Sequence, residues 1–370
     1  MRATKALIHL DILRKNIESI RNYIGKEPLI CMAVKADAYG HGAVKIAEEG
    51  LRCGASFLGV ATVGEGAELR KAGISAPILL FSIASPVELD DLIANKLTPF
   101  VTDEEYAEEL HRRSYKAGVI LPVHIKIDTG MGRIGCHPDR AAALALYISS
   151  LKSLHYEGTA THFAISDSRE EQAKNSTKKQ QMRFNHALED IKNAGLDTGI
   201  VHAANSGAIL LHKDVYFNMV RPGILLYGYS PSAELADICP VKPVMEFVSH
   251  LSFIKKVKKG TPISYNGTWV APEDTIIGTI PLGYADGLPR LLTNNYEVFI
   301  NGKLYPLVGN ICMDQCMVNL DTSADIKRWE RVTIFGGNEG AESAADIASK
   351  IKTIPYEILC GINKRVPRVS

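Results

Sequence analysis

The chain has 370 residues, 42 basic against 41 acidic side chains, and 46% hydrophobic residues. This near-neutral balance excludes a strongly basic protein built for nucleic acid or for an anionic membrane surface. The N-terminal apolar stretch is short and is broken by His9 and Asp11, so we expect neither a signal peptide nor a membrane span, and a cytoplasmic protein. Seven scattered cysteines favour thiols over a disulfide framework, and Cys312 and Cys316 alone are too few ligands to predict a metal site.

A helix-like segment that ends near a glycine and leads into a short β-rich run recurs along the chain. A glycine directly after the last helical residue is typical of a helix C-cap, and the run after it predicts the next strand. One helix start is also marked, since Ser85, Pro86 and Glu88 stand in the order of a cap, a first-turn proline and a capping-box acid. The recurring units span residues 47–60, 69–81, 115–127 and 192–206.

Eight β-rich runs alternate with helical patterns before residue 230. Their number, over roughly 220 residues, predicts an α/β protein with an N-terminal (β/α)8 TIM-type barrel. The alternative is a doubly wound open sheet, which usually has fewer strands and a glycine fingerprint that this sequence lacks after its first strand. The predicted strands are 29–34, 56–61, 77–82, 97–101, 122–127, 156–161, 200–203 and 217–221.

The pattern changes after residue 230. From residue 241 onward, short β-rich runs follow one another with Gly, Asn and Pro turns, which predicts a mostly β C-terminal domain. We therefore expect a barrel domain over residues 11–237 and a mostly β domain over residues 238–370. Residues 1–10 are a candidate strand added to the second domain.

The first predicted strand ends in the stretch AVKADAYGHG, where Lys35 is followed by Tyr39 and two glycines. Chemistry in a barrel lies at the C-terminal ends of the strands. A lysine at the mouth of an apolar strand is partly desolvated, which lowers its pKa and frees the amine to form a Schiff base. For a single lysine, a side chain that reaches the surface and joins an ion pair is the commoner alternative.

The loops after the last two predicted strands have the composition of a phosphate site. Ser206 and Gly207 lie in one, and Gly223 and Ile224 lie in the other. A hydroxyl and accessible backbone N–H groups suit a phosphate, which barrels often bind at this place, although glycines that only shape tight turns explain the same pattern. A phosphate across the barrel mouth from a reactive lysine indicates a phosphorylated aldehyde, and pyridoxal phosphate is the commonest.

Longer motifs resemble a known family. Nine segments are similar to those of bacterial alanine racemases, in the same order and across nearly the whole chain. That family combines a pyridoxal-phosphate barrel with a β domain, which agrees with the elements predicted above. The segments are AVKADAYGHG, HIKIDTGMGRIG, THFA, HAANSGA, VRPGILLYG, ISYNGTW, GYADG, GNICMDQCMVNLD and PYEILCGI.

The resemblance implies a role for each matching residue. Lys35 is expected to be the Schiff-base lysine and one catalytic base, and Tyr265 is expected to be the second base. Arg221 is expected to face the pyridine nitrogen of pyridoxal phosphate. The expected cofactor contacts are Lys35, Tyr39, His162, Asn205, Ser206, Arg221, Gly223, Ile224 and Tyr356.

The resemblance also implies how the substrate is held. Arg133, through its side chain, and Met313, through its backbone N–H, are expected to contact the carboxylate of alanine. Lys126 matches a lysine that family members often carry as a carbamate, which orients Arg133. The family forms a head-to-tail homodimer, which implies that each site borrows Tyr265 and Met313 from the partner chain.

The chemistry of these residues suits racemisation, in which a proton leaves one face of a carbon and returns on the other. Two acid–base groups are needed on opposite sides, and a free tyrosine, with a pKa of about 10, needs cationic neighbours to serve as one. A chain from His162 to Arg221 is expected to supply this effect. Because arginine only donates hydrogen bonds, a pyridine nitrogen facing Arg221 stays unprotonated, which favours simple return of the proton.

The resemblance implies interconversion of L- and D-alanine through a pyridoxal-phosphate aldimine, which supplies D-alanine for peptidoglycan. Three alternatives compete with this function. A related decarboxylase would need an acidic residue where Arg221 stands. A pyridoxal-phosphate carrier protein resembles the barrel alone, without the domain that contains Tyr265. A racemase for another small amino acid such as serine stays open, because a pocket for a methyl group rejects one added hydroxyl poorly.

Overall fold

The computed structural model describes residues 2–322, 325–337 and 340–370. Its contacts group the chain into two compact units. Leu13–Ala38 and Ala43–Val241 form the first, which we call the barrel unit. The second, the C-terminal unit, combines Lys242–Ser370 with Tyr39–Gly42 and the described part of Met1–Ile12. The domain boundaries expected from the sequence stay a prediction, and the first residue of the candidate N-terminal strand lies outside the described residues.

An eight-stranded sheet forms the core of the barrel unit, in the order β8-β7-β6-β5-β4-β3-β2-β9, and its paired strands are all parallel. Asn218 joins the two ends of this sheet, because its N–H donates to the Val201 carbonyl at 3.0 Å and its Oδ1 accepts from the Val201 N–H at 2.9 Å. The predicted barrel and its eight strands are confirmed, with the last strand shorter than expected. The strands are β2 (Leu29–Ala33), β3 (Phe57–Val60), β4 (Ile78–Leu80), β5 (Thr98–Val101), β6 (Leu121–Lys126), β7 (Leu154–Ala160), β8 (Ile200–His202) and β9 (Met219–Val220).

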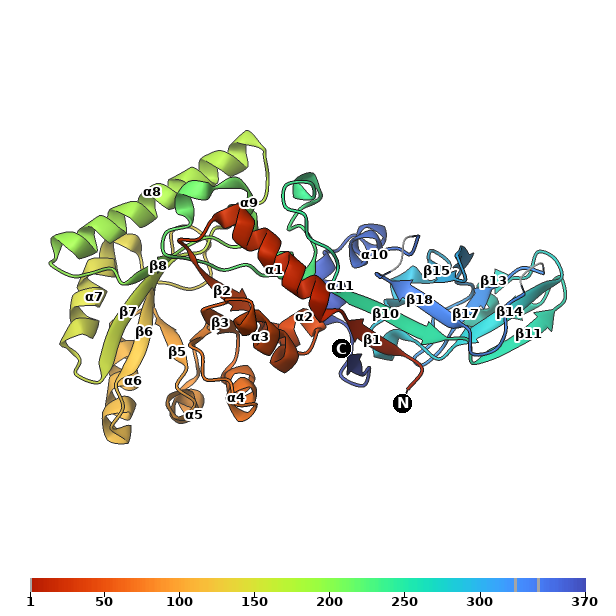
Figure 1. Ribbon diagram of the computed structural model, residues 1–370, viewed down its shortest axis with the longest axis horizontal. Helices are drawn as coiled ribbons and strands as arrows, with labels where there is room; N and C mark the ends of the chain where they lie inside the picture. Colours follow the sequence, from red (N-terminus) through yellow and green to blue (C-terminus); the bar gives the residue numbers. More distant parts are fainter. Residues whose placement is uncertain (1, 323–324, 338–339) are drawn as a thin grey trace. The chain divides into compact units, whose positions relative to one another are not determined.

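Helices cover the outside of this sheet (Figure 1). The apolar side of a helix packs inward, as in α1, where Ile17 and Ile20 are buried one turn apart. The predicted helix start is confirmed, since the Glu88 carboxylate accepts the Ser85 N–H at 3.0 Å, and Gly118 ends α6 with a positive φ of 67° as expected of a C-cap. The helices are α1 (Leu10–Ile24), α2 (Lys35–Gly40), α3 (Ala43–Arg52), α4 (Val63–Lys71), α5 (Leu89–Ala94), α6 (Glu104–Ala117), α7 (Ala141–Ser150), α8 (Glu171–Asn193) and α9 (Ser206–Leu211).

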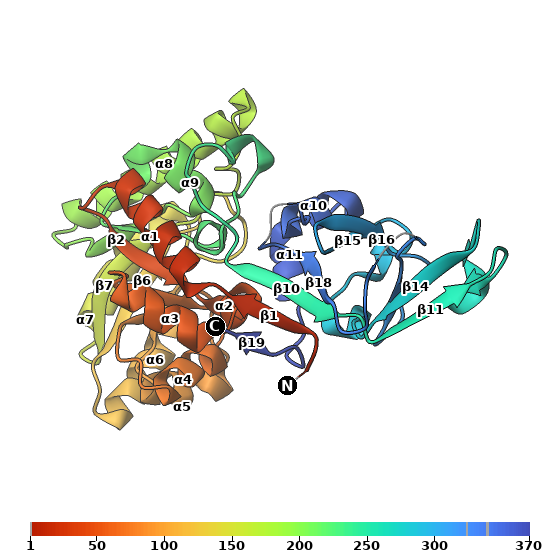
Figure 2. The same ribbon diagram turned by 45° about the vertical axis from the view of Figure 1, so that its right-hand side comes forward.

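The C-terminal unit is mostly β, as predicted (Figure 2). Its described residues form a six-stranded sheet in the order β16-β15-β18-β10-β1-β19, a three-stranded sheet in the order β11-β14-β17, and the β12-β13 pair. The rings of Phe247 and Phe335 pack inside this unit with their centroids 5.5 Å apart. The elements are β1 (Lys5–Ile8), β10 (Met245–His250), β11 (Phe253–Val257), β12 (Pro262–Ile263), β13 (Trp269–Val270), β14 (Thr275–Ile280), β15 (Glu297–Ile300), β16 (Lys303–Pro306), β17 (Cys316–Asn319), β18 (Arg331–Phe335), β19 (Arg368–Val369), α10 (Ala344–Ile351) and α11 (Pro355–Cys360).

The N-terminal strand β1 lies inside the larger sheet of the C-terminal unit. It pairs antiparallel with β10, where Lys5 faces Val248, and parallel with β19, where Ala6 faces Arg368. A strand from the start of the chain therefore completes a sheet whose other members come from its end. In the part of the chain that the structure describes, no helix is both long and apolar enough to cross a membrane.

Candidate active site

The chain leaves β2 through Lys35 and enters a left-handed turn. In α2, the four residues from Ala36 to Tyr39 have φ angles between 52° and 54°. The left-handed conformation costs an L-residue about 1–2 kcal/mol, so four in succession need support from their surroundings. Strained backbone of this kind is concentrated at functional sites.

Glu65 supports the start of this turn within the barrel unit. One oxygen of its carboxylate accepts the Ala36 N–H at 2.7 Å, and the other accepts the Ala61 N–H at 2.7 Å. Glu65 is also the acid of a capping box with Thr62 at the start of α4. A single carboxylate therefore ties the end of β2 to the loop after β3 and fixes the backbone next to Lys35.

The end of the turn, Tyr39–Gly42, belongs to the C-terminal unit. There the rings of Tyr39 and Tyr356 lie with their centroids 5.8 Å apart. Burial raises the pKa of the Tyr39 hydroxyl, which therefore stays a hydrogen-bond donor near neutral pH. Gly40 has a φ of 82°, and a Cβ on it would collide with the Leu359 carbonyl, so only glycine fits. Two of the predicted cofactor residues, Tyr39 and Tyr356, are thus brought together.

Arg221 follows β9 and is almost fully buried. Its Nη1 donates to Nδ1 of His202 at 2.8 Å, and its Nη2 donates to the carbonyls of Thr161 and Ala203 at 2.8 and 3.0 Å. Nη2 also lies 3.2 Å from Nδ1 of His162. Among the described residues these partners include no carboxylate, so the guanidinium is a buried cation held by neutral acceptors.

The charge states around Arg221 follow from its burial. Burial lowers the pKa of Arg221 to about 10, which leaves it a cation at neutral pH. Burial and then the charge of Arg221 hold the pKa values of His162 and His202 well below their usual range. Both imidazoles are therefore neutral, and each turns a lone pair toward the guanidinium. The predicted pairing of His162 with Arg221 is present in the structure.

Ser206 and Gly223 connect the loops after β8 and β9. The Gly223 N–H donates to Oγ of Ser206 at 2.9 Å, and Ser206 is buried at the first position of α9. Asn205 caps that helix by accepting the Ala208 N–H at 3.0 Å. Ile224 begins a buried 3-10 turn directly after Gly223. Four predicted cofactor residues thus share one corner of the barrel unit.

Lys126 ends β6 as a buried lysine that forms no salt bridge among the described residues, although the charge of Asp128 acts on it. Its Nζ donates to the Ile127 carbonyl at 3.2 Å, and burial, followed by the charge of Arg221, lowers its pKa to about 7. Arg133 is exposed in the loop after β6, and in the described structure no hydrogen bond joins it to Lys126. The expected orientation of Arg133 by a modified Lys126 stays a prediction.

Tyr265 and Met313 lie in the C-terminal unit, where both line a cavity of about 590 Å³. They are 71% and 53% exposed, which is high for large apolar side chains. Ser264 and Asn266, on either side of Tyr265, have φ angles of 65° and 61°. Asn310 holds this strained turn, because its carbonyl accepts Oγ of Ser264 at 2.6 Å and its Nδ2 donates to the Tyr265 carbonyl at 2.7 Å.

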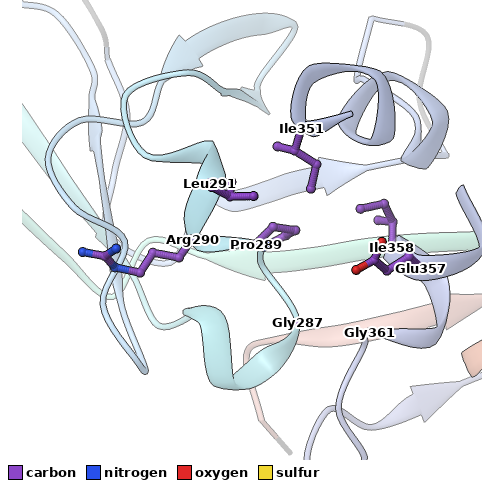
Figure 3. A pocket seen from close by; sticks show the side chains of 8 residues that line it. All are labelled: Gly287, Pro289, Arg290, Leu291, Ile351, Glu357, Ile358 and Gly361. Carbon is purple, nitrogen blue, oxygen red and sulfur yellow. The ribbon is translucent and has the colours of Figure 1, made fainter. Parts of the chain in front are cut away.

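A smaller cavity of about 300 Å³ lies elsewhere in the C-terminal unit (Figure 3). The side chains of Pro289, Leu291, Ile351 and Ile358 line it, and that of Arg290 points away from the others. Its lining is mainly apolar and lacks a convergent set of polar groups. We therefore assign no chemistry to this cavity.

Two residues that support the site were not singled out from the sequence. Glu65 was detectable, because Thr62 and Glu65 have the spacing of a capping box. The contact of His202 with Arg221 depends on the position of β8 beside β9. Its sequence context alone carries no signal of that contact.

The parallel barrel, with this residue set at its strand ends and joined in one chain to a mostly β unit, defines the class of barrel-type pyridoxal-phosphate enzymes. Two family models match the chain, alanine racemase, N-terminal domain, over residues 8–231 and alanine racemase, C-terminal domain, over residues 244–370. The chain belongs to the alanine racemase family, whose members are pyridoxal-phosphate-dependent racemases.

Individual relatives extend over the whole length of the chain. A Treponema denticola protein named alanine racemase is 47% identical, with 100% of this chain and 98% of the relative covered. The structure of an alanine racemase from Clostridium difficile 630 has a TM-score of 0.95 at 39% identity and covers 100% and 95% of the two chains. A Bacillus anthracis alanine racemase described with bound L-Ala-P has a TM-score of 0.93 at 35% identity over 100% and 95% of the two chains.

The residues of the barrel unit fit pyridoxal phosphate. Ser206 and Gly223 bring a hydroxyl and backbone N–H groups from two loops to one place, which suits a phosphate. Arg221 is a buried donor whose described acceptors are all neutral, which suits an unprotonated ring nitrogen. Lys35 supplies a primary amine at the end of the first barrel strand. The carrier alternative is disfavoured, because the chain also matches the racemase C-terminal domain.

Proposed function

We propose that this chain interconverts L-alanine and D-alanine, with Lys35 and Tyr265 as its two acid–base groups. The observation that carries the proposal is the environment of Arg221, whose acceptors among the described residues are imidazoles and carbonyls. A guanidinium cannot give up its proton in a protein, so the ring nitrogen of a cofactor held against Arg221 would stay unprotonated. An unprotonated ring nitrogen favours return of a proton to the same carbon over loss of carbon dioxide.

Pyridoxal phosphate, when bound, withdraws electrons from the α-carbon of the amino acid and makes its proton acidic. Lys35 would hold the group, and Ser206, Gly223, Ile224 and Tyr356 would contact its phosphate. Tyr39, His162, Asn205 and Arg221 complete the set that surrounds it. Support for this set comes from the Ser206–Gly223 hydrogen bond and from the Tyr39–Tyr356 ring contact.

Lys35 and Tyr265 move the proton in the two directions. Lys35 takes or gives it on one face through its amine, and Tyr265 acts on the opposite face through its phenol oxygen. Tyrosine becomes an effective base only beside cationic or hydrogen-bonding neighbours. His162 is the hydrogen-bond donor to the Tyr265 phenol oxygen. Its Nδ1 faces Arg221, so its Nε2 carries a proton that it can donate.

Arg133 and Met313 hold the substrate carboxylate, through a guanidinium and a backbone N–H. The Met313 carbonyl accepts the Ala285 N–H at 3.0 Å, which orients this peptide segment. Lys126 carries a carbamate that orients Arg133. A buried lysine with a pKa of about 7 has the neutral amine that reaction with carbon dioxide requires.

Each active site is shared by two chains in a homodimer, with Tyr265 and Met313 of the partner subunit facing Lys35. The exposure of both side chains, together with the anchored and strained turn that carries Tyr265, supports such a partner. The protein works in the cytoplasm and supplies D-alanine for peptidoglycan.

The activity is tested with L-alanine and the cofactor-loaded protein in heavy water. Deuterium at the α-carbon and optical activity are followed together, with L-serine as a second substrate. Uptake of deuterium with loss of optical activity is the expected result for alanine. A cofactor-loaded protein that leaves alanine unchanged would contradict the proposal, and exchange of serine alone would make it a serine racemase.

The shared site is tested by mixing two inactive variants, Lys35→Ala and Tyr265→Phe, under conditions that exchange subunits. A mixed dimer then has one intact site, formed by Lys35 of one chain and Tyr265 of the other. Random exchange restores about a quarter of wild-type activity when the site is shared across a two-fold axis. No recovery, with mixed dimers demonstrated by mass spectrometry, would mean that each chain builds its own site.

A further inference from the structure

A line of hydrogen bonds runs through the barrel interior from Arg221 to Glu157. Arg221 Nη1 lies 2.8 Å from His202 Nδ1, and His202 Nε2 lies 2.8 Å from His124 Nδ1. His124 Nε2 lies 3.1 Å from a carboxylate oxygen of Glu157. Both imidazoles are fully buried, whereas the Glu157 side chain is 26% exposed. We call these four residues the barrel relay.

The hydrogens of the barrel relay have only one consistent arrangement. Arg221 can only donate, so His202 accepts at Nδ1 and carries its proton on Nε2. His124 then accepts at Nδ1 and donates from Nε2 to Glu157. Each N–H dipole therefore points away from Arg221 and toward the carboxylate, so the three hydrogen bonds polarise one another in the same direction.

An irregularity in the backbone of β7 directs the Glu157 side chain toward His124. In the pairing of β6 with β7, Val123 faces Tyr156 and His124 faces Gly158, so Glu157 is an extra residue in a β-bulge. Bulges redirect side chains and are frequent beside active sites. Gly158 completes the arrangement, since a Cβ there would lie 2.6 Å from the His124 ring.

The far end of the barrel relay opens at the N-terminal ends of the strands. Glu157 lines a cavity of about 550 Å³ there, together with Pro77 before β4, Thr98 at the start of β5 and Pro122 in β6. Arg70 stiffens this cavity, because its guanidinium donates to four backbone carbonyls at 2.7 to 3.0 Å. Lys35 lies at the carboxyl ends of the strands. Glu157 therefore has access to solvent on the other face of the barrel, at the amino ends of the strands.

We propose that Glu157 is a positioning residue for the racemase reaction, acting through His124 and His202 as the remote counter-charge of Arg221. The inference rests on the proposed function of Arg221. The carboxylate increases the electron density that His202 offers at Nδ1, and this holds the buried guanidinium in place with a fixed donating strength. Neutral His202 performs this task while remaining a pure acceptor toward Arg221.

The test compares Glu157→Gln, which keeps an acceptor for His124 but removes the charge, with Glu105→Gln, an exposed glutamate of α6. Nitrogen-15 signals of the imidazoles are recorded on the holoenzyme labelled in histidine, and kinetics are measured with L-alanine. We expect protons on Nε2 of His124 and His202 in the wild type. In Glu157→Gln we expect a shifted His202 signal and a kcat lower by about 3- to 10-fold at an unchanged KM. Glu105→Gln should leave both readouts unchanged.

Glu157→Asp, which retains the charge on a shorter side chain, guards against a folding defect and should recover part of the His202 signal and of kcat. Unchanged His202 signals together with an unchanged kcat in Glu157→Gln would overturn the proposal, as would a proton on Nδ1 of either histidine in the wild type. A wild-type protein that does not racemise alanine refutes the proposed function instead. The nitrogen signals would in that case still decide whether the barrel relay exists.

Discussion

Two pairs of site residues, one in each unit, are held in opposite ways. In the barrel unit, Arg221 and Ser206 are buried and hydrogen-bonded to neighbours in the same chain. In the C-terminal unit, Tyr265 and Met313 are more than half exposed and line an open cavity. The first group is organised by the folding of one chain, while the second is displayed on its surface.

The difference teaches which substitutions affect folding as well as activity. Removing a buried, hydrogen-bonded group leaves its partner unsatisfied, which costs stability. Removing an exposed group has little effect on stability, so any loss of activity reports on function alone. Both units nevertheless carry non-glycine residues at positive φ beside a site residue, at Ala36–Tyr39 and at Ser264. Strained backbone is thus common to both units, while burial distinguishes the pair Arg221 and Ser206 from the pair Tyr265 and Met313.

The largest effect is expected from Lys35→Ala, which removes an acid–base group and the amine that holds the cofactor. Racemisation should fall by about 10⁴-fold, and the substituted protein should retain its fold by circular dichroism. Lys116→Ala, at an exposed position of α6, is the matched control and should be fully active. A Lys35→Ala protein with substantial activity would remove Lys35 from the mechanism.

Tyr265→Phe should reduce racemisation by about 10²- to 10³-fold while changing the free energy of unfolding by less than about 0.5 kcal/mol. The reason is that the phenol oxygen is exposed and needed only for chemistry. Tyr115→Phe, whose tyrosine is also 71% exposed, is the control for both measurements. A large loss of stability in Tyr265→Phe would show that the contrast between the two halves is false.

Ser206→Ala tests a buried site residue, for which both stability and cofactor binding are expected to change. The Gly223 N–H loses its acceptor, which should lower the free energy of unfolding by about 1–3 kcal/mol and weaken cofactor binding about tenfold. Urea unfolding and cofactor titration give the two values. Ser149→Ala, at an exposed serine of α7, should change neither. If affinity falls without any loss of stability, the Ser206–Gly223 contact does not contribute to folding.

The smallest expected effect is the pH dependence of Lys126. With a pKa of about 7, the free amine should rise from about 10% at pH 6 to about 90% at pH 8, and carbamate formed from labelled bicarbonate should rise with it. A carbon-13 signal that is absent in Lys126→Gln identifies the residue. Because the unfolded lysine titrates near 10.5, the unmodified side chain also makes folding more favourable as pH rises from 7 to 10.5. A carbamate signal that is independent of pH would contradict the expected titration of Lys126 near pH 7.

Much of the fold was predictable because its signals are local. Apolar runs gave the barrel strands, and glycines such as Gly118 gave the helix ends. The site residues of the barrel unit were predictable for the same reason, since each follows a strand in a recognisable motif. Their grouping at one end of the barrel required only that parallel strands end at the same edge.

The left-handed turn at Ala36–Tyr39 and the barrel relay were not predictable. The turn depends on Glu65, which is distant in sequence, and the relay depends on the register of β6 against β7. A one-residue change of that register would move Glu157 away from His124, although no residue would differ in type.

By itself, the sequence determined the alternation of strands and helices, the mostly β second half and the chemical types at the strand ends. Periodicity, capping and side-chain chemistry are properties of neighbouring residues, so a linear chain already contains them. Only the tertiary structure decided that Arg221 would be buried among neutral imidazoles, that Lys126 would lose its proton near pH 7 and that Tyr265 would be exposed. Burial and pKa depend on which distant segments surround a group, and that is known only once the chain has folded.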